Sequence, residues 1–393
     1  MSGNFLASYV KSKVLAVLAR VMGLGGQLDL SREALEKAVK LEPWSAEWYY
    51  RLGLIDIRAG RPKEAIVRLE AAVHLRPDHC RYHYWLGKAL EQAGELRRSE
   101  EAYTRSLQMK SHPRTLEALA RVQHKLGLLE AAATNYGLAA TFRPEAGVLN
   151  NRGLCLAQLG RYEEALSCYQ QALRLSPRDP VILYNQGILL QRLGRWEESL
   201  NLLHQAAEAG LEEEANLLAF IALSYSQLGR YQEAITYYRR ALKQAPADAM
   251  VMNELASCLH RAGYRQESWP LFAQALELAP TDITLLNNYA LCLDEAGRYE
   301  EALALYNRGL ALAPQHQVLL ANKAGCLLKW GKYRRALALF RYGTRHYPLH
   351  HEFWWGMGLC LDHLGLEKEA LEAYNRALEL QRGTGRPVDV YPA

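Results

Sequence analysis

Two segments of the sequence place adjacent asparagines in nearly the same setting. Asn150–Leu166 is NNRGLCLAQLGRYEEAL and Asn287–Leu303 is NNYALCLDEAGRYEEAL; twelve of seventeen residues agree, although the segments start 137 positions apart. An asparagine amide offers both hydrogen-bond donors and an acceptor, so a row of amides can bind the backbone of an extended peptide whatever its sequence. The chemistry that these pairs predict is recognition.

A second group of residues combines cations with aromatic rings. The net charge is only +5 over 393 residues, so any basic surface must come from local clustering. Cationic and aromatic side chains together favour an anionic partner. Only three carboxylates, those of Glu47, Glu91 and Glu117, stand among them on the same predicted stripe. The group consists of Arg51, Arg58, Arg81, Lys88, Arg114, Arg121, Lys125, Tyr50, Tyr84 and Trp85.

An internal repeat supplies the elements that must position these residues. Apolar residues recur at three- and four-residue steps on both sides of a marker glycine, which predicts two amphipathic helices per unit. Glycine between them provides the left-handed conformation that ends the first helix. The marker glycines, 33 to 35 residues apart, are Gly26, Gly60, Gly94, Gly127, Gly160, Gly194, Gly229, Gly263, Gly297, Gly331 and Gly365. With this glycine as position 15, eleven units start near residues 12, 46, 80, 113, 146, 180, 215, 249, 283, 317 and 351.

Residue size also repeats within the units. Position 8 is Gly or Ala, positions 20 and 27 are small, and position 24 is large, as at Gly153 and Tyr169 of one unit. Small residues let helix backbones approach closely, and the large residue fills the space beside them. One hairpin cannot bury its own apolar face, so neighbouring units must stack. One unit is a residue longer and lacks its helix-ending proline, so we expect an irregularity near Gly210.

These units resemble the tetratricopeptide repeat family. The pattern is clear in AEWYYRLGLIDIRAGRPKEAIVRLEAAVHLRP and in ANLLAFIALSYSQLGRYQEAITYYRRALKQAP. The resemblance implies an all-α fold, a right-handed superhelical α-solenoid of helix-turn-helix repeats. We expect the repeats to span residues 12–380, with residues 1–11 extending the first helix and residues 381–393 forming a C-terminal tail.

The resemblance also implies that positions 2, 5, 6, 9, 12 and 13 of each first helix line a concave groove. Eight of the thirteen asparagines fall on positions 2, 5 and 6. Those at position 6 resemble the peptide-gripping asparagines in the repeat region of O-linked N-acetylglucosamine transferase, although other units carry Phe220 or Glu254 there. The alternative is that the amides bond neighbouring helices and set curvature. The candidate peptide-binding residues are Asn150, Asn151, Asn185, Asn216, Asn253, Asn287, Asn288, Asn322, Tyr184 and Arg192.

Cysteines and histidines are common metal ligands, and cysteines also carry out redox chemistry. Five of the seven cysteines recur at position 10, too far apart for disulfides, so we expect small buried packing residues in a reducing compartment. Pro348 interrupts the histidines around it, and neither a phosphate-binding loop nor a nucleophile-elbow motif occurs. We expect no catalysis, no metal and no cofactor.

The leading hypothesis is a non-catalytic scaffold that binds an extended peptide segment of a partner protein. The alternative is an accessory, substrate-docking array of a larger polymer-handling enzyme, such as a glycosyltransferase or polysaccharide-assembly enzyme, which binds an anionic polymer at the basic zone. Nucleic acid is not expected, because the cations are few and share the face with acids.

The sequence contains no apolar stretch long enough for a membrane span, and we expect a cytoplasmic protein. The last unit has no polar capping helix after it. Two explanations stay open, self-association at that end or a following domain.

Overall fold

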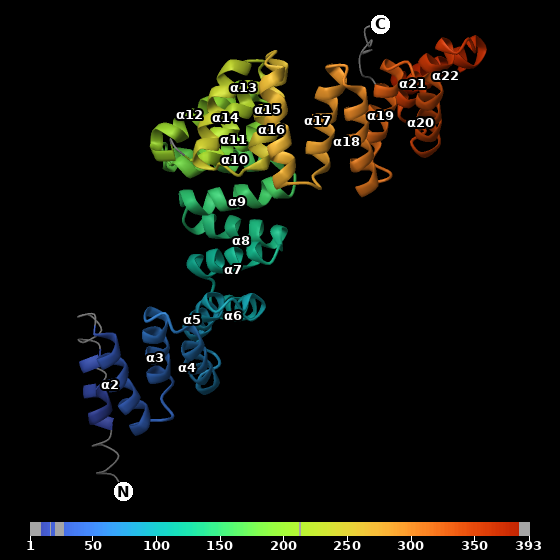
Figure 1. Ribbon diagram of the computed structural model, residues 1–393. Helices are drawn as coiled ribbons and strands as arrows, with labels where there is room; N and C mark the ends of the chain where they lie inside the picture. Colours follow the sequence, from blue (N-terminus) through green and yellow to red (C-terminus); the bar gives the residue numbers. More distant parts are fainter. Residues whose placement is uncertain (1–8, 16, 20–26, 212–213, 385–393) are drawn as a thin grey trace. The chain divides into compact units, whose positions relative to one another are not determined.

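The computed structural model describes residues 9–15, 17–19, 27–211 and 214–384, and all regular structure in them is helical (Figure 1). Contacts divide the chain into two compact units, Met1–Arg195 and Trp196–Ala393. In the first unit, residues 9–15 and 17–19 are helical, followed by α2 (Leu28–Leu41), α3 (Ala46–Arg58), α4 (Pro62–Leu75), α5 (Cys80–Gln92), α6 (Leu96–Met109), α7 (Pro113–Lys125), α8 (Leu129–Phe142), α9 (Ala146–Gln158), α10 (Tyr162–Leu175) and α11 (Pro180–Arg192).

The second unit continues the same pattern. Its helices are α12 (Trp196–Ala206), the π-helical segment η1 (Ala207–Leu211), α13 (Ala215–Gln227), α14 (Tyr231–Gln244), α15 (Ala249–Arg261), α16 (Arg265–Leu278), α17 (Ile283–Glu295), α18 (Tyr299–Leu312), α19 (Gln317–Lys329), α20 (Tyr333–His346), α21 (His351–His363) and α22 (Glu367–Thr384).

Within each unit, consecutive helices pack as antiparallel hairpins, and each hairpin packs on the next. In the first unit α7 packs on α8 and α8 on α9, which lie as successive layers in Figure 1. In the second, α13 packs on α14 and α14 on α15. The predicted all-α repeat fold is confirmed.

The marker glycines end the first helix of each hairpin as predicted. Their φ angles lie between 68° at Gly60 and 90° at Gly263, in the left-handed region that side chains disfavour. Gly26 lies outside the described residues. The same conformation holds at Gly94, Gly127, Gly160, Gly194, Gly229, Gly297, Gly331 and Gly365.

Aspartate caps begin several of the first helices. The Asp179 carboxylate accepts hydrogen bonds from the backbone N–H groups of Val181 (3.0 Å) and Ile182 (3.2 Å), which satisfies donors that the first turn leaves open. Asp248 caps α15 and Asp282 caps α17 in the same way.

Close packing inside the hairpins rests on the residue pair at positions 8 and 24. A Cβ placed on Gly153 would lie 2.8 Å from Cε1 of Tyr169, and one on Gly87 would lie 2.8 Å from Cδ1 of Tyr103. Both tyrosines are fully buried. The predicted role of the small residue is confirmed, because no side chain fits between the helix and the ring.

The predicted irregularity near Gly210 is also confirmed. Ala207–Leu211 is π-helical, and Gly210 has a φ of 125°. This segment lies where the unit is one residue too long.

The two ends are described only in part. α22 runs to Thr384, three residues beyond the Gln381 at which its sequence pattern ends, and residues 385–393 of the expected tail lie outside the described residues. So do residues 1–8 of the expected N-terminal extension. Among the helices that the structure describes, none has the length and apolarity that a membrane crossing requires.

We expect Gly153→Ala to destabilise the protein and Gly147→Ala, in the same helix, to leave its stability unchanged or raise it. A methyl at position 153 overlaps the Tyr169 ring, and such overpacking costs roughly 1–3 kcal/mol, more than the roughly 0.5–1 kcal/mol gained by replacing a helical glycine. At position 147 a Cβ meets no atom within 4 Å. Urea unfolding midpoints test this expectation; equal midpoints for the two variants would contradict it.

Candidate binding site

Three of the predicted asparagines lie together in the first unit. Asn150 and Asn151 are on α9, and Asn185 is on α11. The Nδ2 group of Asn185 donates to Oδ1 of Asn150 at 2.9 Å, and the Nδ2 group of Asn150 lies 3.5 Å from Oδ1 of Asn151. Asn150 is 8% exposed and the other two are half-buried. The hydrogen bonds hold the three amides in one orientation.

The second unit repeats this arrangement twice. Asn288 of α17 donates to Oδ1 of Asn253 on α15 at 3.4 Å, and Asn322 of α19 donates to Oδ1 of Asn287 on α17 at 2.8 Å. In all three links, position 6 of one repeat donates to position 5 of the preceding one, 35 residues earlier. We call these seven residues the linked amides: Asn150, Asn151, Asn185, Asn253, Asn287, Asn288 and Asn322.

Bonds between neighbouring helices, the alternative role for these residues, are therefore present. They use only part of the capacity of each amide, which has two donor hydrogens and one acceptor oxygen. Within the described residues, the Oδ1 atoms of Asn185 and Asn322 accept none of these bonds. The linked amides are thus oriented by the fold and still have groups for a further partner.

Three other predicted peptide-binding residues lie on the first helices α11 and α13. Asn216 is exposed in the first turn of α13. Tyr184 and Arg192 lie on α11, where Arg192 is exposed. At Glu254 burial raises the pKa of the carboxyl, and Asn253 donates to it at 3.2 Å. Position 6 therefore has a different chemistry in that repeat.

Six of the ten predicted basic-zone residues surround one cavity in the first unit, of about 610 Å³. It lies among α3, α5, α6 and α7, and it has cationic and aromatic walls without an aspartate or glutamate. We call it the basic hollow. Its lining residues are Tyr50, Cys80, Arg81, Tyr84, Trp85, Lys88, Ser106, Lys110, His112, Arg114 and Thr115.

Carboxylates hold three of the four remaining cations. Glu91 binds Arg121 at 3.0 Å and Lys125 at 2.9 Å, and Glu47 binds Arg51 at 2.6 Å. Arg58, the last residue of α3, is exposed and does not line the hollow. Glu117 also lies 3.8 Å from Arg121, so three acids balance Arg51, Arg121 and Lys125 and separate them from the cations of the hollow.

The aromatic walls of the hollow are in contact with one another and with a cation. The rings of Tyr84 and Trp85 meet edge to face at 5.5 Å between centroids, and Nζ of Lys88 lies 4.8 Å from the centroid of the Trp85 ring. Burial raises the pKa of Tyr84 and of Tyr50, so both hydroxyls stay protonated near neutral pH. They can donate hydrogen bonds.

Sequence reasoning missed five lining residues. Cys80 and Thr115 lie at the beginnings of α5 and α7, and Ser106 lies on α6, facing the start of α5 through a hydrogen bond to the Cys80 carbonyl (2.8 Å). Lys110 and His112 flank Ser111, which occupies position 32 of its repeat. Eight of the eleven units have a proline at this position, where it ends the second helix. That missing proline is the one signal in the sequence that marks this turn as unusual.

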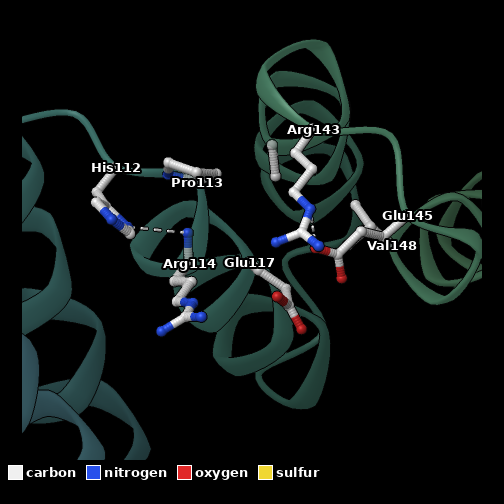
Figure 2. A pocket seen from close by; sticks show the side chains of 8 residues that line it. His112, Pro113, Arg114, Glu117, Arg143, Glu145 and Val148 are labelled. Carbon is white, nitrogen blue, oxygen red and sulfur yellow. Dashed lines mark hydrogen bonds and ion pairs between the residues drawn. The ribbon is translucent and has the colours of Figure 1, made fainter.

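A second, smaller cavity of about 250 Å³ adjoins α7 and contains both signs of charge (Figure 2). Arg143 points at Glu145, and Nε of Arg143 lies 3.1 Å from its carboxylate. Glu117 lies on the same cavity wall, and the His112 ring accepts a hydrogen bond from the backbone N–H of Arg114. We call this cavity the mixed hollow; His112 and Arg114 line it as well as the basic hollow.

The cysteines are packing residues, as predicted. Those at position 10 are buried, and burial raises the pKa of Cys155 to about 11 and that of Cys292, Cys326 and Cys360 to about 12. All seven cysteines are free thiols. Around Pro348, the His350 ring is hydrogen-bonded to Gln317 (2.8 Å).

Three tetratricopeptide repeat models match the chain, one at residues 148–281, one at 25–67, 56–113 and 327–387, and one at 248–315. The chain therefore belongs to the tetratricopeptide repeat family, whose repeats form protein-interaction domains. No curated protein matches it.

Several solved structures share the fold. A tetratricopeptide repeat protein from Parabacteroides merdae ATCC 43184 is 17% identical, with a TM-score of 0.51; the match covers 63% of this chain and 98% of that protein. YrrB, described as having an unusual peptide-binding site, is 22% identical over 49% of this chain and 98% of its own, with a TM-score of 0.41. Yeast Tom70 is 14% identical over 94% and 92%, with a TM-score of 0.46.

We expect Glu91→Gln to lower stability at pH 7 and to have little effect at pH 3. Burial acts to raise the pKa of Glu91, but hydrogen bonds from Arg121 and Lys125 outweigh it and lower the pKa below its ordinary value. A lowered pKa gives stability that is present above the ordinary value of about 4.5 and is lost as the pH falls through the folded-state value.

The expected loss at pH 7 is roughly 1–2 kcal/mol, because both cations are partly exposed. Urea midpoints of wild type and variant at pH 7, 4.5 and 3 measure it. A difference that stays constant over this range contradicts the role assigned to the Glu91 charge.

Proposed function

We propose that this protein is a non-catalytic interaction scaffold that binds an extended segment of a partner protein along its first helices. The observation that carries the proposal is the recurrence of linked amides, from Asn185 to Asn150 in the first unit and from Asn288 to Asn253 and Asn322 to Asn287 in the second. Asparagine is a poor residue for a helix interior, so helix propensity does not account for its recurrence there.

The linked amides suit backbone recognition. An extended peptide presents alternating N–H and C=O groups, and a primary amide can bond to either. Because the bonds between helices already fix the amide orientation, less side-chain entropy is lost on binding.

The affinity of such a face is moderate. Each net hydrogen bond contributes about 0.5–1.5 kcal/mol, so the four linked amides of the second unit supply roughly 2–6 kcal/mol before ordering costs. The upper end of this range corresponds to a Kd of roughly tens of micromolar. The amides carry no net charge, so this part of the binding should depend only weakly on salt.

A non-catalytic role agrees with the state of the thiols. Thiolates are the reactive form of cysteine, and burial that raises the pKa of Cys155, Cys292, Cys326 and Cys360 keeps these thiols protonated at neutral pH. Free thiols in all seven positions are typical of a reducing compartment such as the cytoplasm.

Substitution of the asparagines that donate in these links should weaken peptide binding. Uncharged twelve-residue peptides selected from a display library serve as probes, and fluorescence anisotropy gives their Kd. We expect Asn288→Ala with Asn322→Ala, two changes in the second unit, to raise Kd about tenfold, because each change removes roughly 0.5–1.5 kcal/mol of bonding. Asn307→Ala is the matched control, since Asn307 is an exposed asparagine on a second helix, α18.

The peptides themselves provide the sharper comparison. N-methylation of alternate backbone amides should abolish binding, whereas single alanine substitutions in the peptide should change Kd by less than about threefold if backbone groups dominate. The opposite pattern, tolerance of N-methylation and strong dependence on side chains, would rule out the linked amides as the peptide-binding element. Thermal unfolding of each variant confirms that it is folded.

A further inference from the structure

We propose that the basic hollow binds an anionic group of a partner peptide, either clustered carboxylates or a phosphorylated side chain. The proposal deepens the proposed function, on which it rests for the kind of partner, and it adds a second site of different chemistry. Its residues all belong to the first unit, so the site is complete without the second.

Uncompensated charge is the first argument. Arg81, Lys88, Lys110 and Arg114 line the hollow, and no ion pair of theirs with a carboxylate is found among the described residues. The nearby carboxylates of Glu47 and Glu91 are occupied by cations that do not line it. Four like charges around one cavity raise the local concentration of anions and strengthen each hydrogen bond to them.

Backbone groups act in the same direction. α5 begins at Cys80, and its first two residues, Cys80 and Arg81, line the hollow. The first turn of a helix has N–H groups without partners inside the helix and carries partial positive charge. At α7, Pro113 has no N–H, and the N–H groups of Arg114 and Thr115 are bonded to His112, so the backbone contribution comes from α5 and supplements the side chains.

The aromatic walls determine what kind of anion fits. Tyr84 and Trp85 form an edge-to-face pair beside Tyr50, and a small inorganic anion would leave this surface without a contact. A cavity of about 610 Å³ has room for several side chains. A peptide that carries an acidic or phosphorylated residue next to an aromatic or aliphatic one matches both the charge and the apolar walls.

The surroundings favour a short anionic segment over a long polyanion. A polysaccharide or nucleic acid repeats its charge and needs a continuous basic track. Next to the hollow, however, Arg121 and Lys125 are paired with Glu91, Arg121 also lies 3.8 Å from Glu117, and the mixed hollow presents Glu145. The unpaired positive charge is therefore local.

The test uses the full chain and four fluorescent probes. The probes are a twelve-residue peptide with clustered glutamates and one tyrosine, the same peptide with glutamine for glutamate, a neutral peptide with one phosphotyrosine, and a sulfated hexasaccharide. Fluorescence anisotropy is measured for wild type, for Arg81→Gln with Arg114→Gln, and for Arg143→Gln. Arg143 is the matched control, because it lies in the mixed hollow and is paired with Glu145.

We expect the glutamate or the phosphotyrosine peptide to bind the wild type at least about tenfold more tightly than the glutamine peptide, with the stronger of the two identifying the natural anion. The double variant should lose this advantage, and Arg143→Gln should change it less than about twofold. Lys88→Gln, a single change of a half-buried side chain, should give a partial loss and guards against misfolding of the double variant, which thermal unfolding also checks.

Three outcomes would overturn the proposal: equal binding of the charged and uncharged peptides, unchanged binding by a folded double variant, or tighter binding of the hexasaccharide. Each is separable from a failure of the linked amides. The amides are tested with uncharged peptides and asparagine variants, and the hollow is tested by the difference between charged and uncharged peptides.

Discussion

The contact between a large side chain and a helix position without one determines how close the two helices of a hairpin come. Tyr169 occupies the space that a side chain on Gly153 would need, and Tyr103 does the same at Gly87. The contact recurs at Gly53 against Leu69 and at Gly358 against Tyr374, so these hairpins pack closely and neighbouring hairpins can stack in a regular way. The chemistry of the first helices depends on that regularity.

Regular stacking produces a constant contact between successive first helices. Position 5 of one repeat meets position 6 of the next, where Asn150 and Asn185 are bonded. Position 12 meets position 13, where Asp294 binds Lys329 at 2.9 Å and His260 lies 2.8 Å from Glu295. Each pair is separated by 35 residues. One step between repeats therefore carries amide links at positions 5 and 6 and contacts of charged or ionisable side chains at positions 12 and 13, as between the repeats that contain Asn287 and Asn322.

This geometry explains how much the sequence could predict. Repetition of small and large residues predicted the fold, and the extra residue predicted the irregular segment at Gly210, because both depend on local spacing. The linked amides could be placed on one stripe for the same reason. The choice of partner for Glu91 could not be predicted, because Lys125 and Arg121 reach it from α7, the first helix of the next repeat, through their side-chain conformations. Nor could the contribution of Lys110 and His112, which lie in a turn that departs from the repeat pattern.

Photo-crosslinking would show directly whether a partner segment lies along the first helices, as we propose. A benzophenone amino acid would replace Arg192, exposed on the first helix α11, or Gln170, exposed on the second helix α10. A peptide selected by binding is then irradiated with each variant, and crosslinked product is measured by mass spectrometry. We predict a crosslink from position 192 and none from position 170. A crosslink from position 170 alone would contradict it and place the partner on the second helices.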